Sequence, residues 1–330
     1  MATIQDIAKR ANVSKATVSR VINNTTPVAG RTRDAVVAAM KDLKFQPNMM
    51  ARSLAGGRSM TVGIVTQKIG SPFYDTIAQG VISGLSNTGY SPILVDGQWE
   101  SSTSSEVIAT LLGRNVDGLI LIGGDLPAAN LQKLHDRLPT VLVARELKDW
   151  SGPCVHVDNE TAGYRATRHL IQLGHRSIAV IRGIEGHPNA VDRVDGYRRA
   201  LDEANIPFND DLIVSGDFSA QSGILGIEFL LNQGIRFTGV FAANDMAAFG
   251  ARLALHRNGL RVPEDVSVVG FDDQAESAFM TPPLTTMRQP ATEMGQHSAA
   301  ILIAALDGRK VPEQRLEIQL VSRESVARMT

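Results

Sequence analysis

From Met60 onward, the chain alternates apolar runs of strand length with longer helical patterns. The first series of runs reads TVGIV, PILVD, DGLILIG, TVLVA and CVHVD, and the second reads SIAVI, LIVSG, GVFAA and VSVVGFD. Fully apolar strands separated by helices are typical of parallel sheets covered on both faces. Two successive series therefore predict two similar lobes of doubly wound α/β type. Because ligands of such sheets bind beyond the carboxyl ends of the strands, we expect a cleft between the lobes.

The first 46 residues show a different pattern, in which short helices are separated by tight turns. Thr3 can cap a first helix and form a capping box with Asp6. Asn12 tolerates the left-handed conformation that a tight turn requires, and Ser14 can cap a second helix directly after it. Two short helices joined in this way predict a helix-turn-helix, whose second helix reads DNA.

A third helix is expected from about Arg31 to Leu43. Its start lacks a good cap, because Ala29 and Gly30 offer no side-chain acceptor. Its apolar residues are expected to close a small core against the first two helices: Val36, Val37, Met40 and Leu43.

The net charge of −1 hides an uneven distribution along the chain. Residues 1–58 contain ten Lys and Arg against three Asp, whereas the remainder contains 23 Lys and Arg against 31 Asp and Glu. The two parts therefore carry +7 and −8.

The segment SKATVSRVIN, from Ser14 to Asn23, has a polar face of hydroxyls, an amide and cations without an acid. This pattern predicts that the first part alone binds nucleic acid, since a carboxylate there would repel phosphates. A solvated face without a role is the alternative.

Signals of other protein classes are weak or missing in the sequence. No apolar run reaches the ~18 residues of a membrane span, and MATIQDIAKR lacks the apolar segment of a secretory signal. Cys154 is the single cysteine, which excludes an intrachain disulfide and fits a reducing cytoplasm. There is no phosphate-binding loop, dinucleotide fingerprint or nucleophile elbow, and His169 and His175 are wrongly spaced for a zinc site. We therefore expect no catalytic residues, no metal and no cofactor.

Taken together, these features resemble the LacI/GalR (lactose-repressor) family of bacterial transcription regulators. The resemblance rests on the segments TIQDIAKRANVSKATVSRVIN, PNMMARSLAG, SPFY, RVDGY, NDMAAFG, VPEDVSVVGFDD and PPLTTMRQP, in that order. It implies a helix-turn-helix domain at 1–46, a hinge helix and linker at 47–59, and a core at 60–330 like periplasmic sugar-binding proteins. Lobe one would span about 60–159 and 290–320, and lobe two about 160–289 with 321–330. The chain would cross between the lobes near Asn159, Gln289 and Val321.

The resemblance also assigns residues to DNA. Those expected at base edges are Lys15, Ala16 and Arg20, of which Arg20 has the bidentate geometry for guanine. Those expected at phosphates are Thr3, Ser14, Thr17, Ser19, Asn23 and Thr32. Those expected in the minor groove are Asn48, Ala51, Arg52 and Leu54, of which Leu54 would wedge between bases at the operator centre. The alternative for the hinge is that its apolar residues merely pack against the core.

In the core, the resemblance gives seven effector-binding residues: Phe73, Arg145, Arg193, Phe218, Asn244, Asp272 and Gln289. Phe73 could stack on an apolar sugar face, while Arg193 and Asp272 would make charge-assisted hydrogen bonds to hydroxyls. For each residue alone, a structural role in the core or in a salt bridge is the alternative.

Two neighbouring positions refine this set. Asp245 is expected to cap the following helix rather than to bind ligand. Ala144 stands where the family often has Asp, which leaves Arg145 and Glu146 as the nearest charged groups. Arg145 could therefore bind a phosphate or carboxylate on a modified sugar. A carbohydrate is expected over a purine, because aromatic residues make up only 5% of the chain.

The resemblance thus implies a cytoplasmic homodimeric repressor of a carbohydrate-utilisation operon. It would bind a palindromic operator and be released by a sugar or sugar derivative held between the lobes. A corepressor ligand, or no effector at all, would use the same parts. A sugar-binding protein or an enzyme on the same core fold is the more distant alternative.

Overall fold

The computed structural model of the chain describes residues 2–23, 27–45, 57–147, 149–309 and 314–329. It divides into two compact units, Met1–Met60 and Thr61–Thr330, and each is described by itself. Of the expected hinge segment at 47–59, only residues 57–59 are described.

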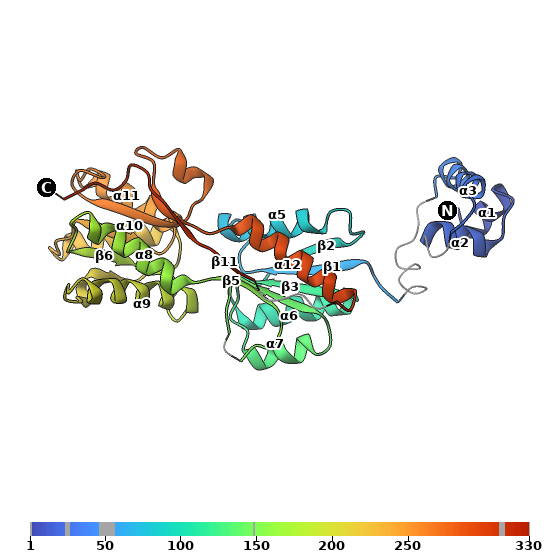
Figure 1. Ribbon diagram of the computed structural model, residues 1–330, viewed down its shortest axis with the longest axis horizontal. Helices are drawn as coiled ribbons and strands as arrows, with labels where there is room; N and C mark the ends of the chain where they lie inside the picture. The colour runs from blue at the N-terminus through green and yellow to red at the C-terminus, as the bar shows by residue number, and fades with distance from the viewer. Residues whose placement is uncertain (1, 24–26, 46–56, 148, 310–313, 330) are drawn as a thin grey trace. The chain divides into compact units, whose positions relative to one another are not determined.

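The N-terminal unit contains helices α1 (Ile4–Arg10), α2 (Lys15–Asn23) and α3 (Gly30–Asp42), as Figure 1 shows. α1 begins with the predicted capping box, in which the Asp6 carboxylate accepts a hydrogen bond from the Thr3 backbone N–H at 2.8 Å. Asn12 adopts a φ of 51° in the turn, and Ser14 Oγ accepts from the Thr17 N–H at 3.1 Å. These local contacts confirm the predicted helix-turn-helix.

The small core of this unit follows the expected helical spacing with one exception. Its buried residues are Ile7, Ala8, Val18, Val36 and Ala39, with Met40 and Leu43 packed against them. The prediction for Val37 is wrong, since its side chain is 53% exposed. A helix advances by about 100° per residue, so the residue beside buried Val36 faces solvent and Ala39 fills the next inward position.

The first sheet of the larger unit has the strand order β11-β5-β4-β3-β1-β2. All of its neighbouring strands run parallel. The strands are β1 (Thr61–Thr66), β2 (Ser91–Asp96), β3 (Gly118–Ile122), β4 (Thr140–Val143), β5 (Cys154–Val157) and β11 (Gln314–Leu316). The helices that cover this sheet are α5 (Pro72–Leu85), α6 (Ser101–Gly113), α7 (Ala128–His135) and α12 (Ala291–Leu306).

The second sheet has the order β12-β10-β9-β8-β6-β7, and in it β12 alone runs antiparallel to its neighbour among the described strands. Its strands are β6 (Ile178–Ile181), β7 (Ile213–Val214), β8 (Gly239–Ala242), β9 (Ser267–Asp272), β10 (Thr285–Arg288) and β12 (Gln319–Val321). Its helices are α8 (Asn159–Gln172), α9 (Pro188–Glu203), α10 (Ala220–Asn232) and α11 (Asp245–Arg257), with short 3-10 turns at Asp210–Leu212 and Ala275–Ala278. Both sheets follow the flavodoxin-like order of doubly wound folds, which confirms the predicted fold class.

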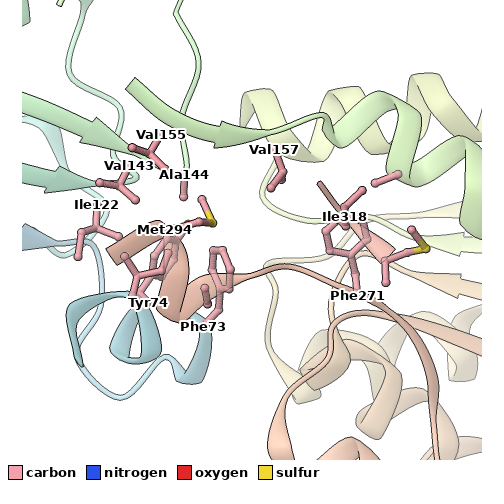
Figure 2. Packing of buried hydrophobic residues seen from close by; sticks show 14 of the residues in the cluster. Phe73, Tyr74, Ile122, Val143, Ala144, Val155, Val157, Phe271, Met294 and Ile318 are labelled. Atoms are coloured by element: carbon pink, nitrogen blue, oxygen red, sulfur yellow. The ribbon is translucent and has the colours of Figure 1, made fainter. Parts of the chain in front are cut away.

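The central strands β3, β4, β8 and β9 are buried on both faces, as the continuous apolar runs predict, whereas the edge strand β2 is exposed or half-buried. In β3, Ile120 and Ile122 pack into the cluster that contains α5 and α12, while Leu119 and Leu121 pack into the cluster of α6 and α7. Figure 2 shows that the first cluster continues toward lobe two, where Phe271 and Ile318 lie. The alternation of side chains along a strand therefore builds a layer of helices on each face.

Within the described residues, the chain passes between the lobes at three places. These lie between β5 and α8, between β10 and α12, and between β11 and β12. The third falls at Glu317 and Ile318, before the expected Val321, because β12 already pairs with β10 from Gln319.

Candidate nucleic-acid interface and ligand cleft

The outward face of α2 carries the residues expected to meet DNA bases. Lys15, Ala16 and Arg20 are exposed, whereas Val18 on the opposite side is fully buried. Thr17 and Ser19 are half-buried along the edges of this face. The first turn of the helix contains no acidic residue. The sequence thus places a small-residue, cationic face where a close approach to phosphates is possible.

The other expected phosphate contacts lie at helix starts. Thr3 is exposed, but its hydroxyl already donates to Asp6 at 2.7 Å. Thr32 lies half-buried in the first turn of α3, which has no side-chain cap and no acid. An uncapped helix start offers free backbone N–H groups to an anion. Asn23 ends α2, while the four expected hinge contacts lie outside the described residues: Asn48, Ala51, Arg52 and Leu54.

Between the two lobes lies a cavity of about 340 Å³ at the carboxyl ends of the strands. Aromatic and apolar side chains form much of its wall, and a few polar groups point into it. Five of the seven expected effector residues are on this wall: Phe73, Arg193, Phe218, Asn244 and Asp272. A mostly apolar wall with a few convergent polar groups is the usual form of a small-molecule site.

Arg193, from α9, is the central cation of the cavity. It is 4% exposed, and its Nε donates to Asn159 Oδ1 at 2.9 Å while Nη1 donates to the Ala243 carbonyl oxygen. Its guanidinium carbon lies 3.5 Å from the ring centroid of Phe271 and 5.9 Å from that of Phe218. Burial lowers the pKa of Arg193, and the charge of Asp272 acts against this shift. Packing and hydrogen bonds thus fix the guanidinium before any ligand arrives.

Asp272, at the end of β9, faces this cation. Its backbone has a φ of 109°, and its Oδ1 accepts a hydrogen bond from Gln289 Nε2 at 2.7 Å. Burial raises the pKa of Asp272 to about 6, although Arg193 lowers it. Gln289 therefore lies behind Asp272, on a neighbouring depression rather than on the main cavity wall.

The cap of α11 is Asn244 rather than the predicted Asp245, and Asn244 also lines the cavity as expected. Asn244 caps α11, because its Oδ1 accepts from the Ala247 N–H at 2.9 Å, and its Nδ2 donates to the Phe218 carbonyl oxygen at 2.9 Å. The prediction that Asp245 caps this helix is wrong, since Asp245 is fully buried in a polar network.

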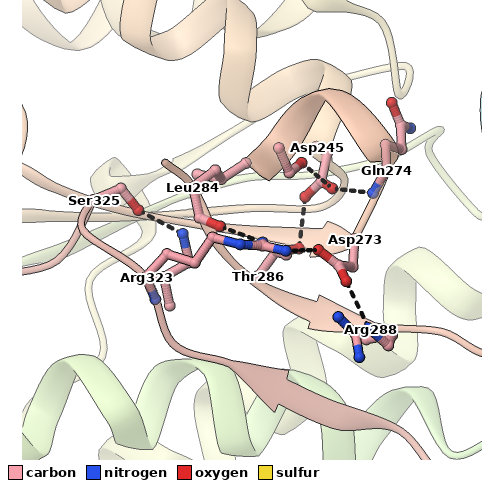
Figure 3. A network of polar contacts seen from close by, with 10 residues as sticks. Asp245, Asp273, Gln274, Leu284, Thr286, Arg288, Arg323 and Ser325 are labelled. Atoms are coloured by element: carbon pink, nitrogen blue, oxygen red, sulfur yellow. Dashed lines mark hydrogen bonds and ion pairs between the residues drawn. The ribbon is translucent and has the colours of Figure 1, made fainter. Parts of the chain in front are cut away.

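Figure 3 shows this network around Asp245. The carboxylate accepts from the Gln274 N–H at 2.8 Å and from the hydroxyls of Ser277 and Thr286 at 2.6 Å each. Burial, together with the charge of Asp272, raises the pKa of Asp245 to about 7. Asp245 therefore connects the segments below the cavity through buried hydrogen bonds instead of capping a helix.

Arg145 does not line the cavity. It follows Ala144, whose φ is 58°, and lies 7% exposed at the end of β4. Its Nε has no hydrogen-bond partner among the described residues, and burial lowers its pKa. The Asn189 side chain, which lines the cavity, donates to the Ala144 carbonyl oxygen at 2.9 Å. Arg145 thus lies behind the cleft wall.

The cavity also contains aromatic residues that sequence reasoning missed: Tyr74, Trp99 and His187. The low aromatic content of the whole chain is therefore a poor guide to the cavity, because the rings are concentrated there. Tyr74 follows Phe73 in the SPFY segment, and Trp99 stands three residues after β2. The one usable signal was the rule that residues just beyond strand ends face the cleft.

A helix-turn-helix unit joined to a two-lobed ligand-binding core defines a ligand-responsive DNA-binding regulator. Residues 3–48 match the family described as "Bacterial regulatory proteins, lacI family", and residues 167–326 match the "Periplasmic binding protein-like domain". The chain is 36% identical to the HTH-type transcriptional repressor PurR of Yersinia pestis (strain Pestoides F) over 99% of its own length and 97% of that protein. The chain belongs to the LacI family of bacterial transcription regulators.

Solved structures agree with this assignment. The lac repressor dimer bound to operator and the anti-inducer ONPF is similar at a TM-score of 0.89, with 30% identity over 99% of each chain. The complex of the transcriptional regulator CelR with cellobiose is similar at a TM-score of 0.74, with 34% identity over 98% of this chain and 100% of that one. These relatives are transcriptional regulators or repressors, which is the class that the sequence predicts. In the described part of the chain, no helix combines the length and apolar content needed to cross a membrane.

Proposed function

We propose that the chain is a homodimeric repressor that binds a palindromic operator in the cytoplasm and is released by a carbohydrate held between its lobes. The observation that carries the effector part is the buried pair of Arg193 and Asp272 on the wall of an aromatic cavity. A guanidinium donor and a carboxylate acceptor suit neighbouring hydroxyls, and the rings suit the apolar face of a sugar. Among similar solved structures, one contains cellobiose and another, from Enterococcus faecium, contains ribose.

The DNA-binding part of the proposal rests on the exposed face of α2. Arg20 and Lys15 would reach base edges in the major groove, and Ala16 would leave room for a close approach. Two such helices, one from each protomer, would read half-sites about one helical turn apart. Leu54 would enter the minor groove at the centre, where an inserted apolar side chain kinks the duplex.

Exposed apolar side chains on lobe two support the homodimer. Leu225 and Phe229 lie four residues apart on α10 and are 55% and 52% exposed, and Leu253 on α11 is 41% exposed. α10 and α11 pack against each other, so these side chains lie on one helical layer. Apolar side chains grouped on a surface mark an association site. A second copy of the chain is the partner that a two-fold operator requires.

The regulatory step would be a change in the angle between the lobes. A ligand that contacts both lobes favours one angle over others only if it binds that state more tightly. In the dimer, the angle would set the distance between the two hinge segments and thus their ordering on the minor groove. Such coupling is typically ~1–3 kcal/mol, or roughly 5–150-fold in affinity. A corepressor would use the same geometry with the opposite sign.

Two measurements test the proposal. Selection of random duplexes with the full-length protein should enrich a palindrome that is bound more tightly than bulk DNA. A thermal-shift screen with sugars and sugar phosphates should then identify a compound that raises the melting temperature and weakens binding to that palindrome. A compound that strengthens binding would establish the corepressor alternative, and no stabilising compound would remove the carbohydrate effector.

A further inference from the structure

The loop after β2 has an uncommon backbone conformation. Gln98 and Trp99 have φ values of 55° and 59°, in the left-handed region that residues other than glycine rarely enter. Hydrogen bonds fix the loop, since the Gly97 N–H donates to the Thr66 carbonyl at 2.7 Å and the Gln98 N–H donates to Asp96 Oδ1 at 2.8 Å. Strained backbone persists where its surroundings hold it, often at ligand clamps. The loop therefore holds Trp99 in a defined place.

The Trp99 ring links the two lobes. Its centroid lies 5.4 Å from that of Tyr74 in lobe one, and 5.4 Å from that of His187 in lobe two, with interplanar angles of 67° and 77°. His187 in turn meets Phe218 edge-on at 5.6 Å. These four rings line the cavity, so the series runs across it from one lobe to the other. Edge-to-face geometry is the favoured arrangement of such rings.

The second tryptophan of the chain provides a contrast. Trp150 is 8% exposed, its Nε1–H donates to the Pro153 carbonyl at 3.3 Å, and its ring meets His135 at 5.1 Å. Trp99 is half-buried at the cavity, and within the described residues its Nε1–H has no protein acceptor. A tryptophan with an apolar body and an unused donor is suited to a ligand that presents an oxygen.

We propose that Trp99 is a positioning residue that latches lobe one to His187 of lobe two and closes the cavity. Its free indole N–H then donates to an oxygen of the ligand held beneath it. The latch itself concerns the protein alone. The ligand contact rests on the proposed function, because it requires that this cavity holds the effector.

The first experiment tests the latch without a ligand. In full-length Trp150→Phe protein, Trp99 is the sole indole, so its fluorescence reports on its own surroundings. Adding His187→Ala should shift the emission maximum to the red and raise the acrylamide quenching constant at least twofold. His187→Phe, which keeps an aromatic edge, should restore both values. His135→Ala is the matched control, since His135 meets Trp150 and not Trp99. Unchanged emission and quenching in His187→Ala would overturn the latch.

The second experiment tests the ligand contact with cellobiose, ribose and their phosphates as probes. A probe that stabilises the Trp150→Phe protein should change Trp99 emission and bind at least tenfold more weakly to the Trp99→Ala variant. Equal affinity for both proteins would overturn the ligand contact. If no probe stabilises the protein, the proposed carbohydrate effector fails, while the fluorescence of the first experiment still decides the latch.

Discussion

The N-terminal unit and the core use polar side chains in opposite ways. The candidate DNA contacts described in the first unit lie within Thr3–Thr32, mostly on exposed or half-buried helix surface. The candidate effector contacts span Phe73 to Gln289, and Arg193 and Asp272 are 4% and 7% exposed. A surface that binds phosphates needs exposed hydrogen-bond donors that can exchange water for phosphate oxygens. A ligand cleft needs charged groups whose positions are already fixed by neighbouring side chains. A change in the cleft should therefore disturb folding, while a change at the exposed face of α2 should disturb DNA binding alone.

The largest effect is expected where the cleft depends on packing. Phe271 is fully buried beneath the Arg193 guanidinium. Phe271→Ala should lower the free energy of unfolding of the core by ~3–5 kcal/mol, because it leaves a cavity and removes the ring on which the Arg193 guanidinium packs. Chemical denaturation measures this loss. Val191→Ala, at a 44% exposed position of α9, is the control and should change stability by less than ~0.5 kcal/mol. A loss below ~1 kcal/mol for Phe271→Ala would show that the cleft is not pre-packed.

The second prediction concerns the pH dependence of stability. Burial raises the pKa of Asp272 from 3.8 to about 6, so the folded chain keeps this proton over a range in which the unfolded chain has lost it. The contribution of protonated Asp272 to the free energy of unfolding is therefore complete below about pH 4 and is lost as the pH rises through about 6. Asp272→Asn removes this loss. Its stability relative to the native chain should rise by roughly 3 kcal/mol between pH 4 and 7, at 1.36 kcal/mol per pKa unit.

Denaturation curves at several pH values measure this difference in stability. The readout is the change of the difference with pH, because the Asp272→Asn substitution also alters the hydrogen bond from Gln289, which affects stability at every pH. Asp245 stays in place, but Asp272→Asn removes the charge that partly raises its pKa, so the pH-dependent loss from Asp245 also becomes smaller in the variant. If the stability of the two proteins changed with pH in the same way, the raised pKa of Asp272 would be contradicted.

On the DNA face, the effect should appear in affinity and leave stability unchanged. Arg20→Ala should weaken operator binding by ~1–3 kcal/mol, since it removes a bidentate base contact, and should change binding to random DNA little. Fluorescence anisotropy with labelled duplexes measures both affinities. Arg10→Ala is the matched control, because Arg10 is engaged with Asp42 on the surface at 2.9 Å. If both variants lose the same affinity, α2 does not read bases.

The smallest effect is expected at the first helix cap. Thr3→Ala removes the capping box of α1 and should destabilise the N-terminal unit by about 1 kcal/mol. Circular dichroism during thermal unfolding measures the loss. A Thr3→Ser variant keeps the acceptor and should lose much less. Equal losses for Ala and Ser would mean that the side-chain cap does not stabilise this unit.

Sequence reasoning succeeded where structure is local. The capping box at Thr3, the left-handed turn at Asn12 and the apolar strands follow from the nearest neighbours of each residue, and the described structure confirms them. It failed at Val37 and Asp245, because the direction of a side chain relative to a packed partner decides which residue is inside. Asn244 takes the cap and Asp245 the buried network, although either residue type can do either job.

The candidate site was predictable only in part for the same reason. Phe73, Arg193, Phe218, Asn244 and Asp272 do reach one cavity wall, and their contact with an effector stays a prediction. The sequence analysis did not predict Trp99 and His187, since they follow different strands in different lobes and meet only across the cleft. Arg145 lies behind the wall because the chain turns at Ala144. Such placements depend on the angle between lobes, which no short segment encodes.

The central claim is that a ligand in the core controls DNA binding by the N-terminal unit, and thermodynamic reciprocity tests it directly. Calorimetry can measure the Kd of the stabilising compound for the full-length protein, free and saturated with its selected palindrome. The account predicts that the operator changes this Kd by the same factor by which the compound changes operator affinity. A Kd that is equal with and without the operator would contradict the account.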